Sequence, residues 1–171
     1  MFPWILVAAT LTVSCSSPVV PSSDNPYPSL ATVRAEPAAS LAPAEARLIR
    51  EVSGERFMNI TGPEPAFFGH VWGVQLTADE TFAFYSAQLQ RLGWVPDFRP
   101  ILSSGELRGW GWCKPSLFFR LAIFDPADYD RTGIWDGASY RTVFDARING
   151  TARACPYTPA PLPAVPTTPR P

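Results

Sequence analysis

Apolar positions repeat most regularly between Thr77 and Trp94. Thr77 and Glu80 have the spacing of a capping box, in which two side chains satisfy backbone amides of the first helical turn. Large apolar side chains then recur at helical spacing, at Phe82, Tyr85, Leu89 and Leu92. Gly93 is placed to end the helix in the left-handed conformation, with Trp94 folding back on the last turn. The pattern predicts a capped helix with one face on a core.

Around this helix the apolar positions alternate with a period of two, which predicts half-buried strands. The predicted strands are Phe68–Leu76, Leu107–Lys114, Leu117–Phe124 and Tyr140–Ile148. In the last of them, Tyr140, Thr142, Phe144, Ala146 and Ile148 share one face, and Arg141, Asp145 and Arg147 share the other. This predicts core on one face and water on the other. A shorter edge strand is expected at Val95–Ile101, because Pro96 and Pro100 interrupt it.

The segment Pro43–Val52 precedes these elements and predicts a short first helix, since a proline stands at its start and Leu48 and Val52 lie one turn apart. One capped helix between a first strand and an antiparallel meander is typical of the α+β class. We therefore expect an open, mainly antiparallel sheet of four or five strands, with the long helix packed on one face and a short N-terminal helix.

Two flanks surround the expected domain at 43–155. Residues 16–42 and 156–171 are rich in proline with serine, alanine or threonine, so we expect a disordered tether and a disordered tail. Residues 1–14 form an apolar run of signal-peptide length, shorter than the ~20 residues that a membrane-spanning helix needs. The sequence thus predicts a signal peptide at 1–15 and export.

Two motifs resemble those of bacterial lipoproteins. Leu11-Thr-Val-Ser-Cys15 resembles a lipobox, which implies that the Cys15 thiol carries a diacylglycerol and that the mature chain begins there with acyl groups such as palmitate. The stretch Leu76–Trp94 has the pattern Phe-Tyr-x3-Leu-x3-Gly-Trp at Phe84–Trp94 and is followed by a tryptophan-containing hairpin. It is similar, over residues 65–150, to a domain of uncharacterised putative bacterial lipoproteins. That resemblance implies a fold and brings no catalytic residues. Alternatives are cleavage a few residues after Cys15, and a true start upstream of Met1.

Charge and cysteine content limit the chemistry. The formal net charge is −1 and basic residues are scattered singly, which excludes a nucleic-acid footprint. With Cys15 assigned to lipid, Cys113 and Cys155 remain as a disulfide pair in an oxidising compartment. The rival interpretation is Cys113 as a nucleophile assisted by His70, for which no orienting group is evident.

No motif predicts a reaction or a cofactor. His70, the one histidine, alternates with apolar strand residues and fits a sheet position, and a single histidine without free cysteines does not make a conventional zinc site. The carboxylates near predicted strand ends are those expected at turns. They are Asp97, Glu106, Asp125 and Asp145. The loop Asp128–Ser139 imitates a calcium loop, but Ser139 replaces the final glutamate, so a solvated loop is favoured.

Tryptophans give the remaining functional hint. The candidate aromatic face comprises Trp72, Trp110, Trp112 and the loop residue Trp135. Exposed, these rings would bind an envelope polysaccharide or a protein partner; covered by the helix, they would be core. We expect a non-enzymatic binding or scaffolding protein, lipid-anchored at the extracytoplasmic face of the cell membrane. The alternative is a hydrolase acting on an envelope polymer.

Overall fold

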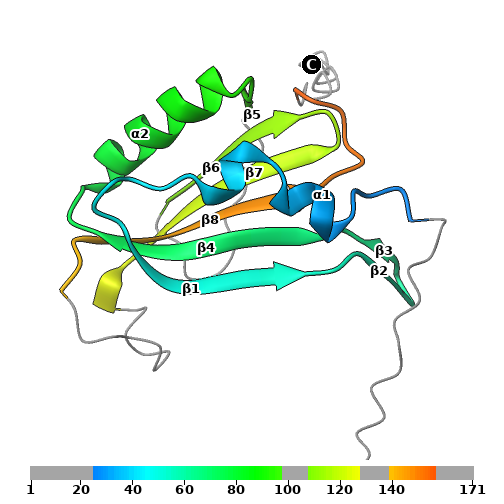
Figure 1. Ribbon diagram of the computed structural model, residues 1–171, viewed down its shortest axis with the longest axis horizontal. Coiled ribbons are helices and arrows are strands. Elements are labelled where there is room, and N and C mark those ends of the chain that lie inside the picture. Colours follow the sequence, from blue (N-terminus) through cyan, green and yellow to red (C-terminus); the bar gives the residue numbers. More distant parts are fainter. Residues whose placement is uncertain (1–24, 98–107, 128–138, 157–171) are drawn as a thin grey trace, which may run out of the picture.

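The computed structural model describes residues 25–97, 108–127 and 139–156, which form an α+β fold (Figure 1). Its main sheet has six strands, all antiparallel, in the order β1-β4-β8-β7-β6-β5. These strands are β1 (Arg47–Gly54), β4 (Phe67–Val74), β5 (Val95–Asp97), β6 (Arg108–Lys114), β7 (Leu117–Phe124) and β8 (Thr142–Gly150). The other elements are the hairpin of β2 (Phe57–Asn59) and β3 (Gly62–Glu64), helices α1 (Leu30–Arg34) and α2 (Ala78–Arg91), and the 3-10 helix η1 (Pro37–Ser40).

The prediction of a short helix at Pro43–Val52 is wrong, because Arg47–Gly54 forms the edge strand β1. It pairs with β4 along the whole strand, with a register shift between Leu48 and Arg50. β4 lies inside the sheet, and its backbone amides and carbonyls need partners on both sides. This pairing outweighs the local helical preference and gives the main sheet more strands than the four or five expected.

The prediction of a disordered tether at 16–42 is wrong for the second half of this segment, which contains α1 and η1. Ser29 caps α1, and its hydroxyl accepts a hydrogen bond from the Thr32 amide at 3.2 Å. Leu30 and Val33 of α1 are buried in the same core as α2. Two alanines of η1 join them. Residues of this segment therefore pack on the sheet, although their composition resembles that of a linker.

Helix α2 has the ends that the sequence predicts. The Thr77 hydroxyl accepts from the Glu80 amide at 3.2 Å, and the Glu80 carboxylate accepts from the Thr77 amide at 2.7 Å. Hydrogen bonds from the Thr77 backbone and side chain lower the pKa of Glu80. At the other end Gly93 has φ +79°, and the Trp94 amide donates to the Leu89 carbonyl at 2.9 Å.

The core fills the space between α2 and the sheet. Tyr85 and Leu89 of α2 are fully buried, and the Tyr85 ring lies 5.6 Å from the rings of Phe119 and Phe144. The Tyr85 hydroxyl donates to the Leu41 carbonyl at 2.7 Å, and burial raises the pKa of this phenol. This bond joins α2 to the chain that follows η1.

The sequence predicted that the opposite face of β8 is exposed to water, but part of this face of the sheet is buried. Val71, Tyr140 and Val143 form a second buried cluster. Tyr140 precedes β8, and its ring lies against Gly73, where a Cβ atom would come within 2.5 Å of it. Asp145, also expected to face water, is only 5% exposed.

A disulfide and an ion pair connect the end of β6 to other parts of the chain. Cys113 and Cys155 form the predicted disulfide, with Cα atoms 5.6 Å apart. Next to it the Lys114 ammonium lies 2.6 Å from the carboxylate of Glu36, the residue that precedes η1. The same ammonium lies 5.1 Å from the centre of the Trp94 ring. The chain before and the chain after the sheet are thus both attached to β6.

Removing the disulfide should destabilise the domain. Its 42-residue sequence separation corresponds to about 4 kcal/mol of lost chain entropy in the unfolded state. Cys113→Ala with Cys155→Ala should lower the free energy of unfolding by up to this amount in urea titrations, and reduction of the unsubstituted protein should match it. Equal stability of oxidised and reduced protein, or two free thiols in peptide maps, would contradict the prediction.

Candidate functional site

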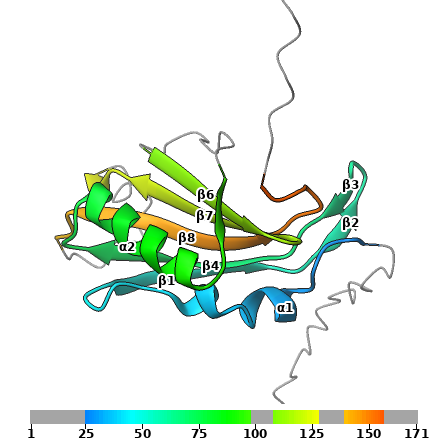
Figure 2. The ribbon, with the colours of Figure 1, turned by 90° about the horizontal axis from the view of Figure 1, so that it is seen from above.

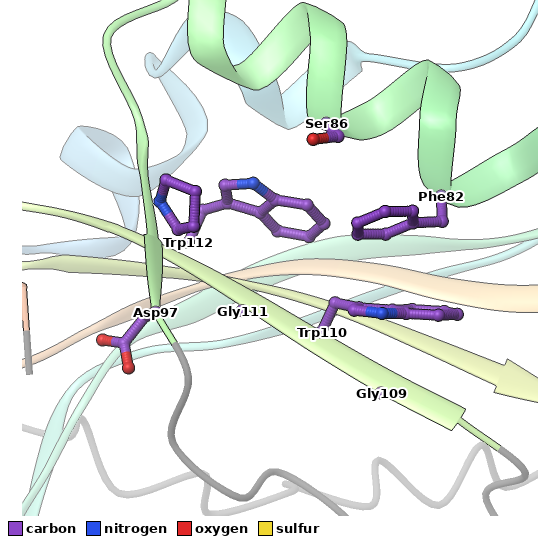
Figure 3. A pocket seen from close by; sticks show the side chains of 8 residues that line it. Phe82, Ser86, Asp97, Gly109, Trp110, Gly111 and Trp112 are labelled. Atoms are coloured by element: carbon purple, nitrogen blue, oxygen red, sulfur yellow. The ribbon is translucent and has the colours of Figure 1, made fainter. Parts of the chain in front are cut away.

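A pocket of about 230 Å3 lies between α2 and the neighbouring strands β5 and β6 (Figure 3). The residues around it are Phe82, Ser86, Pro96, Asp97, Gly109, Trp110, Gly111 and Trp112. Phe82 and Ser86 are one helical turn apart on α2, so both reach the same space. The pocket is therefore built by one helix turn above and the Gly-Trp-Gly-Trp segment of β6 below.

Three aromatic rings form its wall. Phe82 stacks on Trp110, with ring centres 4.8 Å apart and planes 29° apart, and lies 5.9 Å from Trp112 (Figure 3). Trp112 is 2% exposed and belongs to the core, whereas Trp110 and Phe82 are partly exposed. The exposed part of the wall is thus the stacked pair of Phe82 and Trp110.

The alternation of glycine and tryptophan in β6 explains why both indoles point to the helix. Successive strand residues face opposite sides, so Trp110 and Trp112 share the α2 side and Gly111 faces the other. On that other side the Phe118 ring crosses Gly111, where a Cβ atom would come within 2.6 Å of it. A larger residue at 111 would displace Phe118.

The pocket is mostly apolar and small. Its volume is below the ~300–1,000 Å3 of typical ligand sites. The Ser86 hydroxyl is the polar group beside the rings, while the Asp97 carboxylate points away from them (Figure 3). Aromatic faces with a hydroxyl beside them suit a single ring that has an apolar face and polar edges.

The structure divides the predicted aromatic face. Trp110 and Trp112 lie together at the pocket, but Trp72 is on β4, and strands β8 and β7 lie between β4 and β6. Three inter-strand spacings separate them, about 14 Å. Trp72 was expected to extend the same patch, and this is wrong. Its indole nitrogen is buried without a hydrogen-bond partner in the described residues. Trp135 lies outside the described residues.

His70 lies on β4 beside α1, away from the pocket. Its Nε2 is 3.8 Å from Glu51 Oε2, and its ring contacts those of Phe68 and Trp72. The nearby Ser53 hydroxyl accepts from Arg34 at 3.4 Å. A nucleophile and its base need a contact of ~2.6–3.2 Å. No such pair is present among these described residues.

The other candidate groups lie apart from His70. Asp145 faces the opposite side of the sheet, and Asp125 accepts from the Ala127 amide at 2.8 Å after β7. Cys113 is in the disulfide, so it is not a free thiol nucleophile. Three candidates lie outside the described residues: Cys15, Glu106 and the loop 128–138. In the described part, no three histidine, cysteine or acidic side chains gather to hold a metal ion.

A partly buried ionic cluster, which the sequence did not predict, lies on the sheet face opposite α2. Arg147 donates to Asp145, and Arg120 pairs with Arg147 in register across β7 and β8. Burial lowers the pKa of Arg120. The negative charge of Asp145 raises this pKa, and the positive charge of Arg147 lowers it further. Asp145 Oδ1 and Arg147 Nε are buried without hydrogen-bond partners in the described part. Alternating charges on β8 suggested a solvated face, and only the strand order places them at the sheet centre.

Two tryptophan substitutions separate core from pocket. Trp112→Ala should cost about 3–5 kcal/mol of unfolding free energy, because the indole is buried between α2 and Phe119. Trp110→Ala should cost less, about 1–2 kcal/mol, because this ring is partly exposed. Chemical denaturation measures both values. Equal losses at the two positions would show that Trp110 is as much a core residue as Trp112.

No known family model, curated protein or solved structure matches this chain. The similarity of residues 65–150 to putative lipoproteins therefore remains an expectation from the sequence. Over the described residues, no helix has both the length and the apolar character required to cross a bilayer. Among the described residues, we take the aromatic pocket between α2, β5 and β6 as the candidate functional site.

Proposed function

We propose that this protein is a non-enzymatic binding module of the cell envelope, anchored through lipid at Cys15, and that its pocket holds a sugar ring of an envelope polysaccharide. The observation that carries the proposal is the stacked pair of Phe82 and Trp110, partly exposed beside a hollow of about 230 Å3. A pyranose presents an apolar face to an aromatic ring and hydroxyls at its edge, where Ser86 is available.

The size of the pocket favours one ring rather than a whole chain. A polymer would contribute a single residue or its end, with the rest of the polymer in solvent. A site of this size supports modest affinity, since few atoms are enclosed. Retention on a polymer would then come from many anchored copies acting together.

A binding role is favoured over the hydrolase alternative by the position of the ionisable groups. The pocket holds no histidine, and the carboxylate of Asp97 points away from the rings. His70 and Glu51 lie on the other part of the α2 side, beside α1. Polysaccharide hydrolysis generally needs two carboxyl groups ~5–9.5 Å apart across the substrate, and the described pocket offers one acidic residue at most.

The anchor has a direct test. Cys15→Ala should release the protein from the membrane fraction or leave it uncleaved, because the acceptor thiol is gone. Mass spectrometry of the mature chain should show a diacylglycerol on Cys15 in the parent alone. Unchanged mature mass and unchanged fractionation in the variant would refute lipidation.

The pocket is tested with pyranose oligosaccharides and with polysaccharide purified from the producing cell envelope. Binding should change the tryptophan fluorescence of the parent and transfer saturation to ligand protons in NMR. Trp110→Ala should lower affinity about 10-fold, which corresponds to ~1.4 kcal/mol of lost stacking free energy. The control Ala83→Ser changes an exposed position of α2 and should bind normally. Undiminished binding by a folded Trp110→Ala protein would remove this pocket as the site.

A further inference from the structure

The hairpin of β2 and β3 exposes a cluster of apolar side chains. Phe57 is 46% exposed, Met58 50% and Ile60 105%. Among the described residues, the other large apolar side chains with comparable exposure are Leu48 and Val95, which lie singly on the two edge strands. Isolated exposed apolar residues are ordinary, but here Phe57 and Met58 place apolar side chains on the two faces of the hairpin and Ile60 places one at its tip, so that a single short hairpin is apolar on all sides.

Hydrogen bonds within the hairpin hold this patch in place. Asn59 Oδ1 accepts from the Thr61 amide at 2.7 Å and from the Thr61 hydroxyl at 2.6 Å. Asn59 Nδ2 donates to the Glu64 carboxylate at 2.8 Å. Polar side chains at the tip thus satisfy one another, while Ile60 projects into solvent. Because these side chains bond to one another, few polar groups of the tip would lose a hydrogen-bond partner if the tip moved from water into a less polar environment.

The base of the hairpin is attached to the beginning of the described chain. Asn25 Nδ2 donates to the carbonyls of Phe57 and Glu64, at 3.3 Å each. The Arg56 guanidinium donates to the Asn25 carbonyl at 3.2 Å and to the Tyr27 carbonyl at 2.5 Å. Figures 1 and 2 show the hairpin projecting from one end of the sheet, beside the start of the described chain.

This attachment limits the distance between the hairpin and the proposed lipid. Asn25 follows Cys15 by ten residues, which span at most about 35 Å when fully extended. The anchor would therefore keep Asn25, and with it the base of the hairpin, within about 35 Å of the bilayer, so that the hairpin can reach the lipid surface. The other end of the sheet, with most of α2, is farther from that attachment (Figure 1).

We propose that the hairpin tip is a second membrane contact, in which Phe57, Met58 and Ile60 enter the interface of the bilayer that holds the Cys15 acyl chains. This inference rests on the proposed lipid anchor. Three side chains would bind a membrane weakly by themselves, but the anchor keeps them within reach of it at high effective concentration. With the hairpin in the interface, α2 and its pocket are directed away from the lipid, toward envelope polymer.

The test places an environment-sensitive fluorophore at the tip of the acylated full chain. In Ile60→Cys the introduced thiol is the free one, because Cys15 is acylated and Cys113 and Cys155 are bonded to each other. The matched control is Ala83→Cys, at an exposed position on α2. Each labelled protein is reconstituted into phosphatidylcholine–phosphatidylglycerol vesicles, with or without a nitroxide quencher in the acyl region, and floated on a density gradient.

Label at position 60 should shift its emission to shorter wavelength and be quenched by the nitroxide, whereas label at 83 should report water. Flotation with label 60 still in water would overturn the membrane contact and leave the anchor standing. If that label becomes protected only when envelope proteins are added, the patch docks on a protein and the proposal is likewise overturned. A chain that does not float refutes the anchor, and the hairpin contact fails with it.

Discussion

The fold depends on covering one face of a six-stranded sheet. Six strands at ~4.8 Å spacing are about 24 Å wide, whereas one helix covers about 10 Å. Helix α2 covers part of the sheet through Tyr85 and Leu89, and the segment with α1 and η1 covers much of the remainder. The hydrogen bond from Tyr85 to Leu41 joins the two covers. Without the N-terminal segment, a broad apolar area would be left in water.

This constraint explains which elements could be predicted from the sequence. Helix α2 and strands β4, β6, β7 and β8 have local periodicity and turn residues that specify them, and the cysteine count specified the disulfide. Residues 25–42 and strand β1 have no such local signal. Their structure comes from partners far along the chain: Leu30 and Val33 need the sheet, and β1 needs the edge of β4. A linker-like composition does not show that a larger surface nearby will bind the segment.

The candidate site was predictable to the same extent. The alternation in β6 showed that Trp110 and Trp112 point the same way, but it could not show which face α2 covers. Strand order decides the rest. It places Trp72 away from the pocket and puts Asp145 and Arg147 at the middle of the sheet, where Asp145 is buried and Arg147 is partly buried. Hydrophobic alternation describes one strand at a time, while a site is assembled from several.

The two edge strands affect whether neighbouring copies of the protein at high density would associate through their sheets. Proteins confined to a surface meet one another far more often than in solution, and an exposed strand invites addition of a strand from a neighbour. In the described residues β5 spans Val95–Asp97 and contains Pro96, which has no amide to donate. β1 is longer, but its bulge at Leu48–Arg50 disturbs a flat template. Both edges thus discourage sheet-to-sheet polymerisation between close neighbours.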